Sequence, residues 1–321
     1  MVRRNDWSIS ALRMLAMCSI VACHFCQLYG LAAAWSLNIG VQVFLVISGW
    51  LYGLRPNFDH FGRWYGKRLI RICVPYWLVL LPLLFADLLF ASQALTAKTV
   101  FLSVCCIRSG VTPNGAHLWY ISVILLCYLV TPLLDLLWRR SLALPSIGVA
   151  LLFLFFGNRL VPGSIWCIDY LIAYALGRFV RDGVSEQRVL TGCIFTCGGG
   201  CLILLTAHMI FNVSLYTGLH LLGGPLIFSG LRLILHCERF VPSECLKSVL
   251  RWNDGCSYEV YLVHQILILG DFSLALVFPA IPILVIVLAL IWSIAAGYCV
   301  HVLSSFVRTK IETSILSFEH R

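Results

Sequence analysis

Two ionisable residues, Arg13 and His24, stand in the apolar stretch 7–29 near the start of the chain. A charged side chain at the centre of a membrane-spanning helix costs about 2.5–3.5 kcal/mol on insertion scales, so each is a candidate functional residue. They are eleven residues apart; on a helix they share a face and lie about 16 Å apart along the axis. Apolar surroundings disfavour a charged imidazole, which leaves a base able to deprotonate a hydroxyl. The alternative for His24 is a packed histidine bonded to a backbone carbonyl.

A basic cluster follows the second apolar stretch. Arg68 and Arg71 are three residues apart, so on a helix their guanidinium groups can converge on one anion. A guanidinium group binds phosphate bidentately, whereas Lys67, the residue before Arg68, would act only as a point charge. A cytosolic phosphate-bearing ligand such as coenzyme A suits this cluster. The alternative is a patch that faces lipid headgroups or sets the topology.

Composition decides where these residues must work. The 321 residues are 60% hydrophobic and only 12% charged, whereas a soluble domain carries about 25% charged residues. This excludes a soluble enzyme, a disordered chain and an ordinary nucleic-acid-binding protein. We expect one all-α integral membrane domain over residues 1–321, a polytopic bundle of about ten spans.

Apolar stretches between polar breaks mark the predicted spans. The region 92–116 has too short an apolar run to cross a bilayer and is expected to be interfacial. The ten predicted spans are 7–29, 39–54, 73–92, 117–138, 145–161, 165–181, 188–211, 215–236, 255–272 and 276–303.

Lysine and arginine give the orientation. With the amino terminus in the cytoplasm, 19 of the 23 basic residues fall on the inner side, and Lys98, Arg108 and Arg159 on the outer side. This asymmetry follows the positive-inside rule and predicts that both termini are cytoplasmic. It also explains the net charge of +9 without a nucleic-acid partner.

The cysteines predict no metal site. One Cys-x-x-Cys pair, Cys23 and Cys26, lies inside the first apolar stretch, and no second pair supplies further ligands. Cys193, Cys197 and Cys201 recur every four residues beside three glycines, which indicates close helix packing by small residues. We expect no bound metal and no tightly bound cofactor.

Five segments in order resemble the acyltransferase 3 family of integral membrane acyltransferases. They include the Arg-to-His spacing of the first span, a second-span signature that ends in Ser-Gly-aromatic, an Arg-x-x-Arg motif and a late Ser-Tyr-x-x-Tyr-Leu-x-His motif. The segments are 12–24, 40–50, 68–77, 117–122 with Tyr128, and 257–264.

The resemblance implies an enzyme of the bacterial inner membrane. It would move an acyl group, most simply acetyl, from cytosolic acyl-CoA to a hydroxyl of a surface or lipid-linked glycan. Arg68 and Arg71 would bind the donor's phosphates, and His24 would act as general base or acyl relay. Arg13 would either bind the pantetheine-pyrophosphate region or stabilise the bundle.

Three further residues are candidates for acceptor binding: His117, Trp119 and His264. The alternative for His117 and Trp119 is an aromatic belt at the membrane interface, and for His264 it is packing within the bundle. Asp87, Asp135 and Asp169 fall near predicted span ends, where solvation is easy, and are expected to be structural.

The chain departs from the family pattern where many members carry carboxylates. Ser10, Gln42, Ile124 and Leu125 occupy those positions. The departures point to a subfamily resembling short polysaccharide O-acetyltransferases, or to altered activity. A polysaccharide exporter and a non-catalytic homologue therefore remain alternatives to the enzyme.

Overall fold

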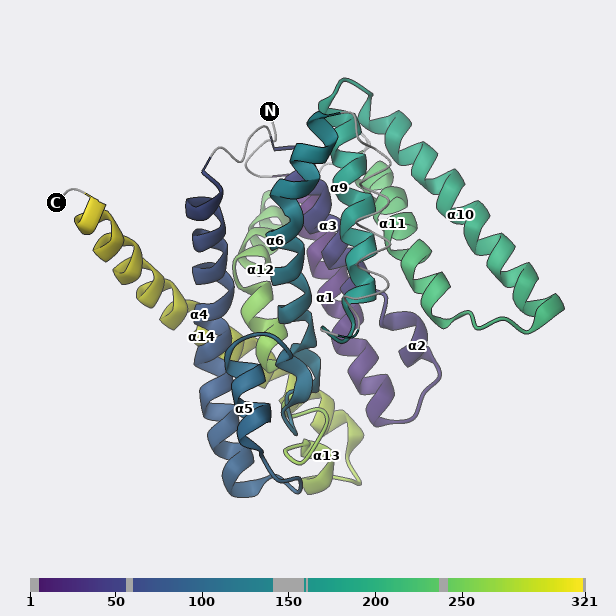
Figure 1. Cartoon of the computed structure of the whole chain (residues 1–321). Helices are drawn as coiled ribbons and strands as arrows, with labels where there is room; N and C mark the ends of the chain where they lie inside the picture. Colours follow the sequence, from purple (N-terminus) through teal and green to yellow (C-terminus); the bar gives the residue numbers. More distant parts are fainter. Residues whose placement is uncertain (1–5, 56–59, 141–158, 160, 237–241, 320–321) are drawn as a thin grey trace. The chain divides into compact units, whose positions relative to one another are not determined.

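A computed structural model of the chain describes residues 6–55, 60–140, 159, 161–236 and 242–319, with side chains up to residue 313 (Figure 1). The elements in this part of the chain are helices, and it contains no strand. The predicted all-α class is therefore confirmed.

The described residues of the amino-terminal half form four long helices and several short ones. The interfacial region predicted at 92–116 holds α5, which at eight residues is too short to cross a bilayer. The elements are α1 (Trp7–Leu28), α2 (Ala33–Leu37), α3 (Gly40–Gly53), α4 (Phe61–Phe90), α5 (Ala97–Val104), η1 (Ser109–Val111), η2 (Ala116–Leu118) and α6 (Trp119–Arg139).

The carboxyl-terminal half continues the all-helical pattern. Polar caps mark α10: Ser185 accepts a hydrogen bond from the Arg188 amide at its start, and Asn212 adopts the left-handed conformation at its end. The elements are η4 (Ser164–Trp166), α9 (Cys167–Arg181), α10 (Glu186–Phe211), α11 (Tyr216–Leu235), α12 (Glu244–Val263), α13 (Leu274–Val277) and α14 (Pro282–Glu319).

Seven segments among the described residues are long and apolar enough to cross a membrane. They correspond to the predicted spans at 7–29, 39–54, 73–92, 117–138, 188–211, 215–236 and 276–303. The predicted span 145–161 lies almost wholly outside the described residues. The count of ten and the orientation of the termini remain predictions.

Two predicted spans differ in detail from the observed helices. In the region 165–181 the helix α9 has only 15 residues, fewer than the roughly 20 that a straight span needs. In the region 255–272 the helix α12 begins earlier, at Glu244, and ends at Val263. The residues after it form turns, so the apolar run from Val263 to Gly270 is not one continuous helix.

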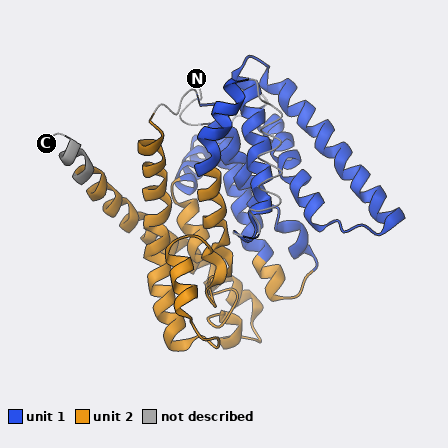
Figure 2. Ribbon diagram, viewed as in Figure 1, with its two compact units in different colours: residues 1–23, 32–57, 129–254 blue, residues 24–31, 58–128, 255–321 orange. Residues whose placement is uncertain are grey.

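Contact clustering divides the chain into two compact units (Figure 2). Unit 1 comprises residues 1–23, 32–57 and 129–254, and unit 2 comprises 24–31, 58–128 and 255–321. The division falls inside α1, α6 and α12, so the chain passes repeatedly from one unit to the other.

Close packing of α3 on α9 organises unit 1. A Cβ atom on Gly49 would lie 2.2 Å from the Tyr170 carbonyl oxygen, and one on Gly53 would lie 2.2 Å from the Tyr174 carbonyl oxygen. Only glycine allows this approach, which is the small-xxx-small packing common between membrane helices. Trp50, between the two glycines, is buried against Phe228 of α11 with ring centroids 5.4 Å apart.

In unit 2, polar contacts hold the region 92–116 against its neighbours. Tyr76 of α4 donates a hydrogen bond to the Ser103 carbonyl (2.8 Å). The Ser109 amide donates to the Ser122 hydroxyl of α6 (3.0 Å). Asn114 donates to Asp87 (2.7 Å). The region is therefore a packed part of unit 2, which precedes and positions His117.

Candidate active site

Three histidines predicted from separate parts of the sequence converge in unit 2. The His24 and His264 ring centroids are 5.1 Å apart, and those of His117 and His264 are 5.3 Å apart. His264 thus lies between the other two imidazoles. The structure brings together three of the seven predicted site residues.

Each histidine stands at or near the end of a helical element. His24 is in the last turns of α1, His117 is in η2 just before α6, and His264 directly follows α12. His264 and His117 are buried, with 0% and 4% of their surfaces exposed, whereas His24 is half-buried. The cluster thus combines two enclosed imidazoles with one that keeps some exposure.

A hydrogen bond sets the tautomer of His24. Its Nδ1 lies 2.6 Å from Oε1 of Gln27, one turn further along α1. Because an amide oxygen only accepts hydrogen bonds, Nδ1 carries the proton and Nε2 keeps its lone pair. The imidazole is therefore held in the form in which Nε2 can take a proton.

Backbone carbonyls set the other two tautomers. His117 Nε2 donates to the Leu262 carbonyl (3.0 Å), and His264 Nδ1 donates to the Tyr261 carbonyl (2.6 Å). The remaining nitrogens, Nδ1 of His117 and Nε2 of His264, are buried without a hydrogen-bond partner. Both can accept a hydrogen bond, and an unmade buried hydrogen bond is costly, so the cluster is suited to a ligand that donates.

Tyr261 contacts two of the three histidines in this cluster. Its hydroxyl donates to the His117 carbonyl, and its ring lies 5.9 Å from the His117 ring and 5.6 Å from the His264 ring. Tyr120 packs edge-on against it at 5.4 Å. Sequence reasoning did not assign roles to Tyr261 or Gln27. The three-residue spacings from His264 and from His24, which place each pair on one helix face, were the available signal.

Arg68 and Arg71 both lie in α4, as the three-residue spacing predicted. Arg68 is half-buried, and its guanidinium lies 5.8 Å from the centroid of the Trp64 ring, whereas Arg71 is exposed. Both belong to unit 2, as do the three histidines. Trp119, also in unit 2, packs against Tyr120 with a centroid distance of 6.5 Å, and Gly110 closely approaches its backbone.

Arg13 has a partner that sequence reasoning missed. Its guanidinium forms an ion pair with Asp254, and both side chains keep about a quarter to a third of their surfaces exposed (26% and 31%). Arg13 and Asp254 belong to unit 1. Asp254 stands 241 positions from Arg13, so no local spacing pointed to it.

The expectation that Asp87, Asp135 and Asp169 are easily solvated is wrong. They are 2%, 5% and 0% exposed, respectively. Asp87 bonds to Asn114, and Asp135 contacts arginines of α6 and α9. Asn114 and Arg178 lie outside the helices that carry these two aspartates. The Asp169 oxygens have no hydrogen-bond partner among the described residues, so a place near a span end did not reveal burial.

No three His, Cys, Asp or Glu side chains in the described part of the chain are arranged to hold a metal ion. The histidine cluster offers nitrogen lone pairs for hydrogen bonds and protons. An imidazole with a free Nε2, next to hydrogen-bond acceptors in apolar surroundings, can serve general-base transfer of a group to a hydroxyl.

The fold and site define a helical membrane protein with a cluster of three histidines. The chain belongs to the acyltransferase 3 family, whose model, an acyltransferase domain, matches residues 6–302. The family and the long apolar helices make it a multi-pass membrane protein of the acyltransferase class. No curated protein and no solved structure matches the chain.

Proposed function

We propose that this protein is an O-acyltransferase of the bacterial inner membrane. It takes an acyl group, most simply acetyl, from cytosolic acyl-CoA and transfers it to a hydroxyl of a surface or lipid-linked glycan. The observation that carries the proposal is the Nδ1–Gln27 hydrogen bond of His24, which leaves Nε2 as a base.

The transfer uses one proton acceptor. His24 Nε2 removes the proton from the acceptor hydroxyl as its oxygen attacks the thioester carbonyl. The carbon–oxygen bond forms, the carbon–sulfur bond breaks, and the coenzyme A thiolate leaves. The thiolate then takes the proton from His24, which returns to its neutral form. Gln27 Oε1 stabilises the transient imidazolium because it already accepts from Nδ1.

Arg68 and Arg71 hold the donor's phosphates in this proposal. Stacking against Trp64 orients the Arg68 guanidinium, and the Arg71 side chain is exposed. Each guanidinium group offers several N–H donors in a planar arrangement that matches phosphate oxygens.

His117 and His264 receive the acceptor. A glycan presents several hydroxyl donors, and the free nitrogens of these two imidazoles are matching acceptors. Trp119 supplies an aromatic face near the start of α6. This assignment explains why a buried cluster would contain two unsatisfied acceptors.

Two non-enzymatic functions are the alternatives to this proposal: a polysaccharide exporter and a non-catalytic homologue. The second draws on Ile124 and Leu125, which are buried apolar residues (1% and 8% exposed) where many relatives have carboxylates. An exporter needs neither a phosphate-binding arginine pair nor an intramembrane base.

Purified protein in nanodiscs, incubated with radiolabelled acetyl-CoA and glycan acceptors, tests the proposal. Wild type is expected to release coenzyme A and label the acceptor, and His24→Ala to lose at least about a hundredfold in rate. Arg68→Gln is expected to raise KM for acetyl-CoA, whereas Lys67→Gln, one position away, changes it little. Acceptor labelling that survives His24→Ala would refute the base assignment. Absence of acetyl transfer to every acceptor tried would favour export or a non-catalytic role.

A further inference from the structure

Asp135 is a buried carboxylate surrounded by arginines. It lies near the end of α6 and is 5% exposed. Its neighbours come from α6 itself and from α9, and all belong to unit 1. Three arginines contact this one carboxylate.

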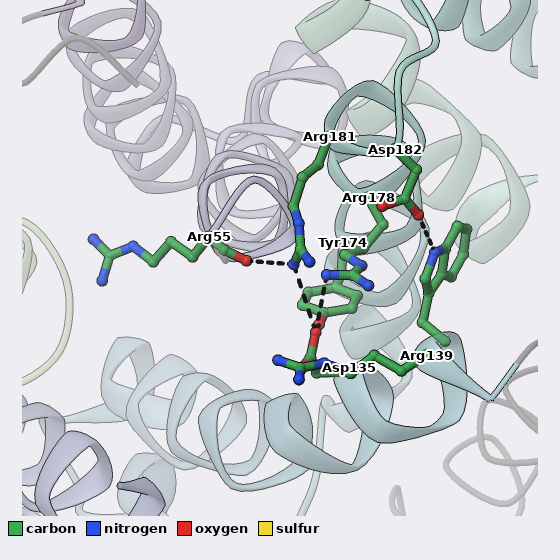
Figure 3. Close-up of polar contacts among 8 residues, drawn as sticks. Arg55, Asp135, Arg139, Tyr174, Arg178, Arg181 and Asp182 are labelled. Atoms are coloured by element: carbon green, nitrogen blue, oxygen red, sulfur yellow. Dashed lines mark hydrogen bonds and ion pairs between the residues drawn. The ribbon is translucent and has the colours of Figure 1, made fainter. Parts of the chain in front are cut away.

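Figure 3 shows the contacts that converge on Asp135. Arg139 Nε lies 2.8 Å from Oδ2, while Arg178 Nη1 lies 3.0 Å from Oδ1. Arg181 Nη1 lies 3.9 Å from Oδ1 and donates to the Arg55 carbonyl at 2.8 Å. The Tyr174 hydroxyl donates to Oδ1 at 3.3 Å.

More guanidinium groups than carboxylates make contact at this site. Three guanidinium groups contact one carboxylate. The carboxyl ends of α6 and α9 each add about half a negative charge, and the neighbouring Asp182 carboxylate adds a further negative charge, so the surroundings offset the positive charge of the group. Asp182 accepts a hydrogen bond from the Trp138 indole N–H (2.6 Å).

Arg178 is under-bonded as well as buried. Its side chain is 3% exposed, yet Nε and Nη1 make no hydrogen bond, although Nη1 is within ion-pair distance of Asp135. Leaving charged donors unsatisfied in a buried position costs more than leaving neutral ones. The Arg178 guanidinium therefore has donors available for an additional anionic acceptor.

We propose that Arg139, Arg178 and Arg181 form a binding site for a phosphate group, built on Asp135 and distinct from the Arg68 and Arg71 pair. Arg178 forms its buried floor. The side chains of Arg139 and Arg181 are 43% and 27% exposed and form its accessible rim. Asp135 holds the three guanidinium groups together in the absence of a ligand.

Phosphate fits this arrangement better than a carboxylate does. Its tetrahedral oxygens can accept from several guanidinium groups at once, whereas a planar carboxylate offers only two oxygens. The phosphate can belong to a free anion or to the headgroup of an anionic lipid. Both share this chemistry, and the experiment below separates them.

Full-length protein in phosphatidylcholine nanodiscs provides the test. In one arm, inorganic phosphate is titrated at constant ionic strength and the midpoint of thermal unfolding is followed. In the other, phosphatidic acid replaces half of the phosphatidylcholine without free phosphate. A saturable rise in the midpoint in either arm is expected, and the arm that responds identifies the source.

The variants locate the response. Arg139→Gln and Arg181→Gln are expected to weaken binding about tenfold, since each removes one charge-assisted interaction. Arg140→Gln removes the same charge from the adjacent exposed position and should bind as wild type does. Arg68→Gln should also leave this binding unchanged, which separates this site from the proposed donor site.

Three results would overturn the inference: no saturable response in either arm, wild-type affinity in both rim variants, or equal weakening by Arg140→Gln. If a glutamine variant does not fold, the corresponding lysine variant replaces it. Lysine keeps the charge but loses bidentate hydrogen bonding, so weaker binding supports the site and unchanged affinity contradicts it.

Discussion

The His24 imidazole lies 5.1 Å from that of His264, centroid to centroid, although 240 positions separate them in the chain. The contact joins the end of the first helix to the residue that follows α12. His264 in turn contacts His117. The proposed base is therefore part of a three-imidazole cluster, and its chemistry depends on how the neighbours are held.

Gln27 is predicted to control the tautomer of His24. Gln27→Leu removes the acceptor for Nδ1–H, so the proton can move to Nε2 and occupy the position needed by the base. We expect kcat to fall about tenfold with KM for acetyl-CoA unchanged. Steady-state kinetics measure both.

Gln27→Glu retains an acceptor oxygen and should recover most of the rate. Cys26→Ser, one position away, is the matched control. A Gln27→Leu enzyme with wild-type kcat would show that the hydrogen bond has no catalytic importance.

Arg13 is predicted to act through its ion pair with Asp254. Arg13→Gln and Asp254→Asn should lower thermal stability alike, and the double variant should lose less than the sum of the two. A double-mutant cycle is expected to give a coupling of about 0.5–1 kcal/mol, because both partners are partly exposed.

Kinetics distinguish the alternative role of Arg13 in donor binding. If the ion pair is the main function of Arg13, both variants lose stability alike and KM for acetyl-CoA is unchanged in both. A rise in KM confined to Arg13→Gln would instead assign Arg13 to the donor.

Gly53 is predicted to be essential for the packing of α3 on α9. Gly53→Val places side-chain atoms where a Cβ already lies 2.2 Å from the Tyr174 carbonyl oxygen. We expect a loss of about 1–3 kcal/mol in unfolding free energy, measured by denaturant titration in detergent. Gly199→Ala is the control, because a Cβ there meets no atom within 4 Å; a loss as large in that variant would contradict the packing explanation.

Asp6 is predicted to make stability depend on acid pH. Burial raises the pKa of Asp6, but Arg232 and the hydrogen bonds from Ser8 outweigh it and lower the pKa below its usual value. Because the folded state holds the proton less tightly, this stabilisation is complete above the usual aspartate pKa. It is lost as the pH falls through the lower, folded-state pKa.

Asp6→Asn tests this linkage. The Asp6–Arg232 ion pair spans 2.5 Å, and its loss should cost about 1–3 kcal/mol at neutral pH. The difference from wild type should shrink as the pH falls below the usual aspartate pKa. Glu312→Gln, at an exposed position, is the control; an Asp6→Asn deficit that does not change with pH would contradict the prediction.

The sequence alone determined the helical class and most of the long helices, because apolar runs of sufficient length have few alternatives in a bilayer. It also identified Arg13, His24, His117 and His264, because ionisable groups are rare in such runs. The family followed from motifs in five segments and is confirmed by the match over residues 6–302.

Only the tertiary structure decided which of these residues meet. His264 contacts His24 and His117, Arg13 pairs with Asp254, and Asp135 gathers arginines from two helices. Helical periodicity relates residues within one helix but carries no information about which helix lies beside it. Packing between helices brings together residues far apart in the sequence, and it is this packing that surrounds the buried polar groups with their neighbours.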